Sequence, residues 1–465
     1  MKKTLSILFV FVFLAVICSC SPKNDGSDAG ESAESITYNG VVPEYFSDDE
    51  FYIGMWVGPP TEFVEYDEDK QPLSTRAATD EDYERHYKLI KEAGFGYVDC
   101  GLGQTSESYY IKMLPFAEKY GLKQYVYDGT VNRLLSDAEA EDEFLVRDVK
   151  KALAKYTKYS SFAGLRIKDE PSYNEIAAFG RGSKIFKQAC PGAYYYINLF
   201  PTYASPSLIN NDYVSYIKKY VDEIDSPFIS YDFYAMKGNG KVNTVADSFL
   251  YNMLEVRNAA KDKEMWTFLQ AIKYGSRNRA LTSVADATFQ AYSFLAFGGK
   301  GIQWFCYFSP PPHTESFGEG CIGWNGEPTA VYDYVKTANL ELRDLQSVYF
   351  NFEWKGFMLN GENENFGLVK GRSGYIAEHP GIKSFDAEKD TLTGVFKDAD
   401  GRDGFMIVNF TEPSGGLSDK VSVTFNGATG ALVYKHGKPE VVGLKNGKLD
   451  IELGAGEGYF VIPLA

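Results

Sequence analysis

Short apolar runs alternate with amphipathic helical stretches over roughly 300 residues of this chain. Such alternation places consecutive strands parallel to one another in a single sheet. Eight strands at this spacing predict an α/β fold, a closed (β/α)₈ barrel, and no Gly-x-Gly-x-x-Gly follows the first strand to suggest a dinucleotide-binding sheet. The expected strands are Phe51–Val57, Gly96–Cys100, Lys123–Tyr127, Gly164–Lys168, Tyr194–Leu199, Phe228–Tyr234, Trp266–Ala271 and Gly301–Phe308.

Helical periodicity fills the segments between these strands. One start signal is Ser136-x-x-Glu139, which has the form of a capping box and predicts a helix from there to about Tyr159. The other expected helices are Asp80–Ala93, Asn174–Gln188, Leu208–Val221, Val245–Ala260, Val284–Phe297 and Thr329–Val348.

The sequence pattern changes after about residue 350, where short β-type runs are separated by Asn-Gly and Asp-Gly turns. This pattern predicts a small all-β sandwich over residues 349–465, behind a barrel over residues 41–348. The expected strands include Phe405–Asn409, Val421–Phe425, Leu432–Tyr434, Leu449–Leu453 and Gly458–Ile462.

The N-terminus has the features of an export signal. Lys2-Lys3 precedes an apolar run from Leu5 to Cys18 that is too short to span a bilayer. The following Ser19-Cys20 resembles the lipobox of bacterial lipoproteins, which implies a signal peptide over residues 1–19 and lipidation of Cys20. Polar residues then predict a flexible tether over residues 20–40. We expect an exported lipoprotein on the periplasmic or cell-surface side of a bacterial outer membrane, held only by its lipid anchor.

Charge and composition limit the classes of molecule that this protein is expected to bind. A net charge of −16 repels phosphate backbones and disfavours nucleic acid. Polyanionic glycans are disfavoured as well unless a local basic cleft exists, so a neutral carbohydrate substrate is expected. The 34 Tyr and 33 Phe either fill the core or serve as platforms for sugar rings. The four His and the dispersed Cys show no ligand spacing, and we expect neither a metal nor another cofactor.

The fourth expected strand carries the leading catalytic candidate. In a (β/α)₈ barrel the active site lies at the C-terminal ends of the strands. Side chains alternate along a strand, so Arg166, Lys168 and Glu170 are expected on the inward face. Glu170 would then project into the mouth above two cations, where a carboxylic acid among aromatic rings can protonate a glycosidic oxygen.

Other strand ends supply candidate partners. Asp232 is the second catalytic candidate, as base or stabiliser, because it shares the polar face of the sixth strand. The candidates for substrate binding come from seven further positions at or near strand ends: Trp56, Asp128, Asp169, Asn198, Tyr234, Gln270 and Trp304.

Asp169-Glu170-Pro171 resembles the Asn-Glu-Pro or Asp-Glu-Pro motif of clan A glycoside hydrolases, which include β-galactosidases and cellulases. In that clan the Glu is the acid/base. The segment 290–305 is similar to the passage from the seventh helix to the eighth strand of β-galactosidase-like barrels. The clan also implies a nucleophilic Glu at the end of strand seven, but Gln270 stands there, and an amide cannot serve as that nucleophile.

Residues 162–170 also resemble the strand-four pattern of the chitinase family, with Glu170 again as the acid. Tyr231-Asp232 and Trp304 match further features of that family, whereas Lys168 departs from its substrate-steering Asp. Asp169 would be the alternative residue for that substrate-steering role. Retaining, inverting and substrate-assisted mechanisms therefore all stay open. The main hypothesis is a glycoside hydrolase acting on a neutral oligo- or polysaccharide, and the alternative is a non-catalytic glycan-binding lipoprotein on a degenerate barrel.

Overall fold

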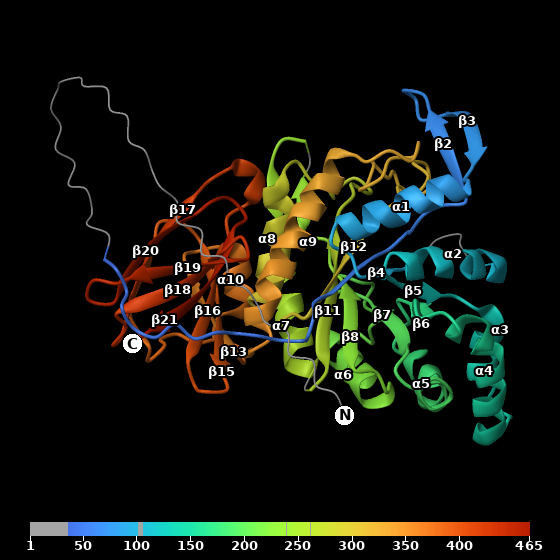
Figure 1. The fold of residues 1–465 in the computed structure, drawn as a ribbon, viewed down its shortest axis with the longest axis horizontal. Helices are drawn as coiled ribbons and strands as arrows, with labels where there is room; N and C mark the ends of the chain where they lie inside the picture. Colours follow the sequence, from blue (N-terminus) through green and yellow to red (C-terminus); the bar gives the residue numbers. More distant parts are fainter. Residues whose placement is uncertain (1–35, 101–105, 239, 261) are drawn as a thin grey trace, which may run out of the picture. The chain divides into compact units, whose positions relative to one another are not determined.

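The computed structural model describes residues 36–100, 106–238, 240–260 and 262–465 (Figure 1). Cys20, the signal peptide 1–19 and residues 20–35 of the expected tether lie outside the described residues. In the described ranges no helix combines the length and the apolar character that crossing a membrane requires.

Eight parallel strands form the predicted barrel. Along the sheet they follow the order β1-β12-β11-β8-β7-β6-β5-β4. The ends of the sheet meet through backbone hydrogen bonds, from the Gly96 amide to the Ile53 oxygen at 2.9 Å and from the Gly58 amide to the Asp99 oxygen at 3.0 Å. The strands are β1 (Tyr52–Met55), β4 (Tyr97–Val98), β5 (Lys123–Val126), β6 (Phe162–Asp169), β7 (Tyr194–Leu199), β8 (Phe228–Asp232), β11 (Glu264–Gln270) and β12 (Gly301–Phe305). The expected (β/α)₈ architecture is confirmed.

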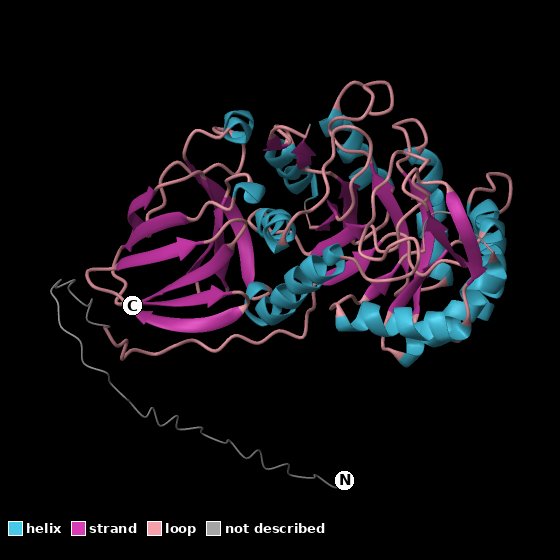
Figure 2. Cartoon of the chain, turned by 90° about the horizontal axis from the view of Figure 1, so that it is seen from above, coloured by secondary structure: helices cyan, strands magenta, loops and turns pink. Residues whose placement is uncertain are grey.

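Helices surround these strands, as Figure 2 shows. They are α1 (Asp80–Glu92), α2 (Glu107–Lys119), α3 (Gly129–Leu135), α4 (Asp142–Thr157), α5 (Ile176–Ala189), α6 (Tyr213–Glu223), α7 (Phe249–Ala260), α8 (Val284–Leu295) and α9 (Ala330–Tyr349). The predicted capping box at Ser136 is wrong, because Ser136 ends α3 and α4 begins six residues later, at Asp142. Helix α2, which contains Pro115, was not expected.

Two small pairs of strands accompany the barrel. The hairpin of β2 (Glu62–Tyr66) and β3 (Pro72–Ala77) follows the first strand. A second antiparallel pair, β9 (Met236–Gly238) and β10 (Asn243–Val245), follows the sixth barrel strand, β8. Neither pair was predicted, since β9 and β10 are only three residues long and β3 is exposed along its whole length.

The C-terminal region is an antiparallel sandwich, as predicted. One sheet has the order β13-β15-β16-β21-β18-β19 and the other β14-β17-β20. Apolar side chains such as Phe405, Val423 and Val461 form the core between them. The strands are β13 (Phe352–Asn360), β14 (Ile382–Ala387), β15 (Thr391–Asp398), β16 (Asp403–Asn409), β17 (Asp419–Phe425), β18 (Gly430–Lys435), β19 (Lys438–Gly443), β20 (Lys448–Leu453) and β21 (Gly458–Leu464), with α10 (Glu364–Val369) and the 3₁₀ turn η1 (Pro413–Gly415) between strands.

Aromatic side chains fill the barrel near the N-terminal ends of its strands. The ring of Trp266 lies between those of Tyr52 and Phe228, with both pairs of ring centres 3.8 Å apart. Most of the largest fully buried side chains of the described residues are Tyr. Much of the aromatic content is therefore core packing, and only the rings near the C-terminal ends of the strands are left for ligands.

Candidate active site

The end of β6 departs from simple alternation. The register between β6 and β7 shifts between Arg166 and Lys168, as at a β-bulge, so the side chains beyond the shift change faces. Asp169 takes the inward place, with its Oδ1 accepting a 2.9 Å hydrogen bond from Arg166. Lys168 instead pairs with Glu175, Nζ to Oε1 at 3.4 Å. The expectation of two cations beneath Glu170 is corrected to one, Arg166.

Arg166 is the buried centre of the mouth. Its guanidinium donates to Asp99 Oδ2 at 2.6 Å as well as to Asp169. Its central carbon lies 3.4 Å from the centre of the Trp56 ring and 4.8 Å from that of Tyr196. Two carboxylates and two aromatic rings thus fix one cation. This contact also brings Trp56, a predicted binding residue, to the site.

Glu170 follows the bulge in a strained backbone conformation. Its φ is +47°, in the left-handed region that a residue with a side chain rarely adopts. Its amide donates to the Asn198 oxygen at 2.9 Å, which fixes the turn at the end of the strand. Val57, just beyond β1, has a φ of +57°. Such strain persists only where the surroundings enforce it, and it concentrates at functional sites.

The carboxyl groups of Glu170 and Asp232 lie within hydrogen-bonding reach of each other. Burial, strengthened by the charge of Asp169, raises the pKa of Glu170 to about 7. Burial also raises the pKa of Asp232 well above its usual range, with the charges of Glu170 and Asp169 adding to the effect. Two carboxyls this close hold a proton between them, so the structure brings the two predicted catalytic residues together as a protonated pair.

Asn198 anchors this pair from below. Its Nδ2 lies 3.3 Å from Asp232 Oδ1 and 3.4 Å from Asp169 Oδ1. Its Oδ1 accepts a 2.9 Å hydrogen bond from Ser230, whose hydroxyl also contacts Tyr196 at 2.7 Å. A chain of hydrogen bonds therefore connects the carboxyl groups with the interior of the barrel. The predicted site residues Asp169, Asn198 and Asp232 meet in one network.

Aromatic rings line one side of the mouth. The Tyr234 ring, predicted to bind substrate, lies 5.3 Å from those of both Tyr274 and Phe305, centre to centre. Tyr203 lies against Phe233 with its ring centre 5.1 Å away, and 48% of Tyr203 is exposed. Sequence reasoning missed Tyr203 and Tyr274, because both lie in loops without periodicity. Their position just beyond β7 and β11 was the available signal.

A further carboxylate near the mouth was also missed. Glu315 lies in the segment between β12 and α9, and its backbone oxygen accepts a 2.8 Å hydrogen bond from the Gly275 amide. It is exposed, and its negative charge contributes to the raised pKa of Glu170. The segment around Glu315 has no strand or helix signal that could have placed it.

Two predicted binding residues are buried and bonded within the protein. Asp128 caps α3, accepting hydrogen bonds from the Thr130 and Val131 amides, and its other oxygen pairs with Lys155 at 2.9 Å. Trp304 is fully buried, and its indole nitrogen donates to Asn339 of α9 at 2.8 Å. Alternation along β12 puts Gln303, the neighbour of Trp304, inside the barrel instead. The expected roles of Asp128 in substrate binding and of Trp304 as a sugar platform are corrected accordingly.

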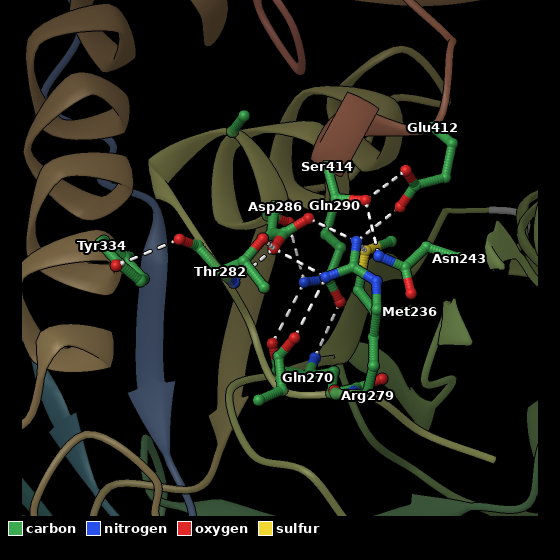
Figure 3. Close-up of polar contacts among 12 residues, drawn as sticks. Met236, Asn243, Gln270, Arg279, Thr282, Asp286, Gln290, Tyr334, Glu412 and Ser414 are labelled. Carbon is green, nitrogen blue, oxygen red and sulfur yellow. Dashed lines mark hydrogen bonds and ion pairs between the residues drawn. The ribbon is translucent and has the colours of Figure 1, made fainter. Parts of the chain in front are cut away.

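Gln270 is held by the protein itself. It is fully buried, and its Nε2 donates to the Arg279 oxygen at 2.6 Å, while its backbone exchanges hydrogen bonds with Gln290 (Figure 3). The Arg279 side chain in turn pairs with Asp286 and Glu412. Gln270 therefore offers no exposed surface to a ligand, contrary to its predicted role. Arg279 connects the loop after β11 with the C-terminal sandwich.

Within the described parts of the chain, no three or more His, Cys, Asp or Glu side chains are grouped so that they could hold a metal ion.

No protein-family model and no curated protein matches this chain. Similar solved structures include glycoside hydrolases. A family 39 glycoside hydrolase from the gut symbiont Bacteroides cellulosilyticus WH2 is 14% identical, with 91% of this chain and 83% of that chain covered and a TM-score of 0.47. A β-galactosidase from Marinomonas ef1 is 10% identical, with 63% of this chain and 60% of that chain covered and a TM-score of 0.46. An α-amylase from Anoxybacillus is 12% identical, with 89% of this chain and 98% of that chain covered and a TM-score of 0.45.

Identity does not exceed 14% and the TM-score does not exceed 0.47 in these three comparisons, so the function proposed below rests on the geometry of the mouth.

Proposed function

We propose that this protein is a glycoside hydrolase whose general acid is Glu170. The observation that carries the proposal is the hydrogen-bonded carboxyl pair of Glu170 and Asp232 at the end of a barrel strand, with the pKa of Glu170 raised to about 7. An acid with a pKa near neutrality both holds its proton and gives it up readily, as protonation of a leaving group requires.

In the proposed reaction, protonated Glu170 donates to the glycosidic oxygen while the bond from that oxygen to the anomeric carbon breaks. Water adds to the anomeric carbon and loses a proton to a carboxylate. Glu315 is the candidate for this base, since it is exposed and acts electrostatically on Glu170 without bonding to it. Asp232 is hydrogen-bonded to Glu170, which leaves no place for an attacking water between them and supports a role as a proton-sharing partner.

The position of Gln270 argues against a retaining mechanism with a nucleophile on strand seven. The amide is not nucleophilic, and the side chain is fully buried and bonded to the Arg279 oxygen. We therefore propose inversion with Glu315 as base, and substrate assistance remains the alternative to be separated by product stereochemistry.

Sugar binding is assigned to the polar and aromatic groups beside the acid. Tyr203 provides an exposed ring face and Asp169 an exposed carboxylate, whereas Tyr234 and Asn198, also predicted to bind the sugar, are buried. We also propose the division into signal peptide 1–19, tether 20–40, barrel 41–348 and sandwich 349–465, with lipidation at Cys20 and attachment to the outer membrane.

The decisive experiment incubates the purified protein with a panel of oligo- and polysaccharides and follows new reducing ends and products. We expect cleavage of at least one glycan and a decrease in kcat of about 10²–10⁴-fold in Glu170→Gln. Glu143→Gln, an exposed change on α4, is the matched control and should keep full activity. Binding without cleavage would favour the non-catalytic glycan-binding alternative, and cleavage unaffected by Glu170→Gln would exclude the mechanism.

A further inference from the structure

Lys237 lies on β9, five residues beyond Asp232, at the aromatic side of the mouth. Its Nζ donates to Asn278 Oδ1 at 2.5 Å and lies 5.4 Å from the centre of the Tyr203 ring. The backbones of Lys237 and Asn278 are also paired across a β-bridge, and the Gly238 amide donates to the Arg277 oxygen at 2.9 Å. The loop after β11 therefore holds this lysine in place from both its backbone and its side chain.

Lys237 lacks a counter-ion in the described part of the chain, where no carboxylate lies within ion-pair distance of its Nζ. Burial, together with the positive charge of Arg277, lowers the pKa of Lys237 to about 8. Arg277 is exposed and likewise makes no ion pair with the described residues. A half-buried ammonium beside a second cation is costly unless an anion offsets it.

Neighbouring charges do not fill this role. Arg279, two residues beyond Arg277, is already neutralised by Asp286 at 2.5 Å and Glu412 at 2.6 Å. On the other side of the mouth, Asp232 bonds to Glu170 and Asn198. The mouth thus has an acidic side that holds the carboxyl pair and a basic side at Lys237 and Arg277.

The donor count of Lys237 matches an anion with two oxygens. An ammonium has three N–H groups, and the described residues provide Lys237 with one bonded acceptor, Asn278. Two donors are left, next to the half-exposed ring of Tyr203. This combination suits a ring stacked on an aromatic face with a charged substituent at its edge.

We infer that Lys237 and Arg277 form a subsite for an anionic substituent on the carbohydrate, either the carboxylate of a hexuronate or a sulfate ester. The inference builds on the proposed function and refines the expected substrate. The net charge of −16 still disfavours a densely charged polymer, whereas the local cation pair accepts a single anionic group at one position.

The test measures binding of matched oligosaccharide pairs to the full-length protein in detergent. One pair consists of a hexuronate-containing oligosaccharide and its carboxyl-reduced form, and the other of a sulfated galactan oligosaccharide and its desulfated form. Each is titrated by calorimetry at low and high salt against wild type, Lys237→Met and Lys184→Met. Lys184 is an exposed lysine on α5 and serves as the control.

We expect one acidic probe to bind at least about tenfold more tightly than its neutral partner, with the preference reduced at high salt and abolished in Lys237→Met. Which pair shows the preference separates the uronate from the sulfate. Equal binding of acidic and neutral partners, absence of binding by both acidic probes, or an equal effect of Lys237→Met on both partners would overturn the inference. A preference without any hydrolysis would leave the subsite standing and refute only the proposed reaction.

Discussion

The carboxyl group of Glu170 shares a hydrogen bond with that of Asp232 at the mouth of the barrel. The two residues lie at the ends of β6 and β8, with Asn198 at the end of β7 bonded to Asp232 between them. Three neighbouring strands therefore build the pair. Its position explains how one carboxyl stays protonated near neutral pH in a chain that carries a net charge of −16.

The pH profile of hydrolysis follows from this pair. In the proposed mechanism protonated Glu170 is the reactive form. Because its pKa is raised to about 7, kcat/KM should be level in weakly acidic solution and fall as the pH rises through about 7. Asp232 keeps its proton and donates to ionised Glu170, which lowers the Glu170 pKa relative to burial alone. Asp232→Ala removes that donor and should move the decline to higher pH, whereas Asp232→Asn should leave it in place. Identical profiles for both variants would contradict the shared hydrogen bond.

The raised pKa of Glu170 should also make the free energy of unfolding depend on pH. A carboxyl whose pKa is higher in the folded than in the unfolded state destabilises the fold as the pH rises from about 4.5 to 7. Glu170→Gln removes this ionisation. After allowance for solvent screening, we expect its free energy of unfolding to exceed that of wild type by about 1–2 kcal/mol at pH 8 and to be the same at pH 4. Urea unfolding at the two pH values measures it, and a gain of equal size at both would show that ionisation is not the cause.

The different exposures of Trp304 and Tyr203 give a third prediction. Trp304→Ala removes a fully buried ring and its hydrogen bond to Asn339, and should lower the free energy of unfolding by about 3–5 kcal/mol. Tyr203→Ala removes a ring that is 48% exposed. It should weaken glycan binding but lower the free energy of unfolding by less than about 1 kcal/mol. Thermal unfolding and calorimetry measure both. If Trp304→Ala weakened binding in a protein of normal stability, Trp304 would belong to the mouth after all.

The sequence predicted the frame of the site better than its details. All eight barrel strands could be located, because buried β-branched and aromatic runs stand out between amphipathic helices. The proximity of Glu170 and Asp232 followed from their positions at strand ends. The bulge in β6 could not be foreseen, since it depends on pairing with β7, and it moved Lys168 out of the mouth and Asp169 into it.

Residues on irregular segments were beyond prediction for a different reason. Tyr203, Tyr274 and Glu315 reach the mouth through loops whose path is set by tertiary contacts, such as the bond from the Gly275 amide to the Glu315 oxygen. The choice of face also failed at β12, a short strand buried on both sides whose residues do not alternate between apolar and polar. There both Gln303 and Trp304 were plausible inward residues, and packing against α9 decided between them.

The buried charges around Arg279 provide a fourth prediction. Arg279→Met would leave Asp286 without its cation in a fully buried place, and removing one partner of such a pair costs about 3–5 kcal/mol. Arg147→Met, which removes an exposed pair with Asp148, is the matched control and should cost about 1 kcal/mol or less. Denaturant unfolding of both variants tests this. Similar losses in both would mean that the Arg279 pair contributes no more than a surface contact.

The anchor prediction rests on Cys20. If this residue is the lipid attachment site, labelled palmitate should enter the protein in growing bacteria, and the protein should partition into the detergent phase of Triton X-114. Cys20→Ser should abolish both and leave the unanchored barrel active, because the proposed tether would separate the anchor from the mouth. Cys18→Ser is the control, since Ile17 in front of it departs from the small residue that the lipobox needs, and it should retain the label. Incorporation unchanged in Cys20→Ser would exclude Cys20 as the anchor and with it the expected lipoprotein topology.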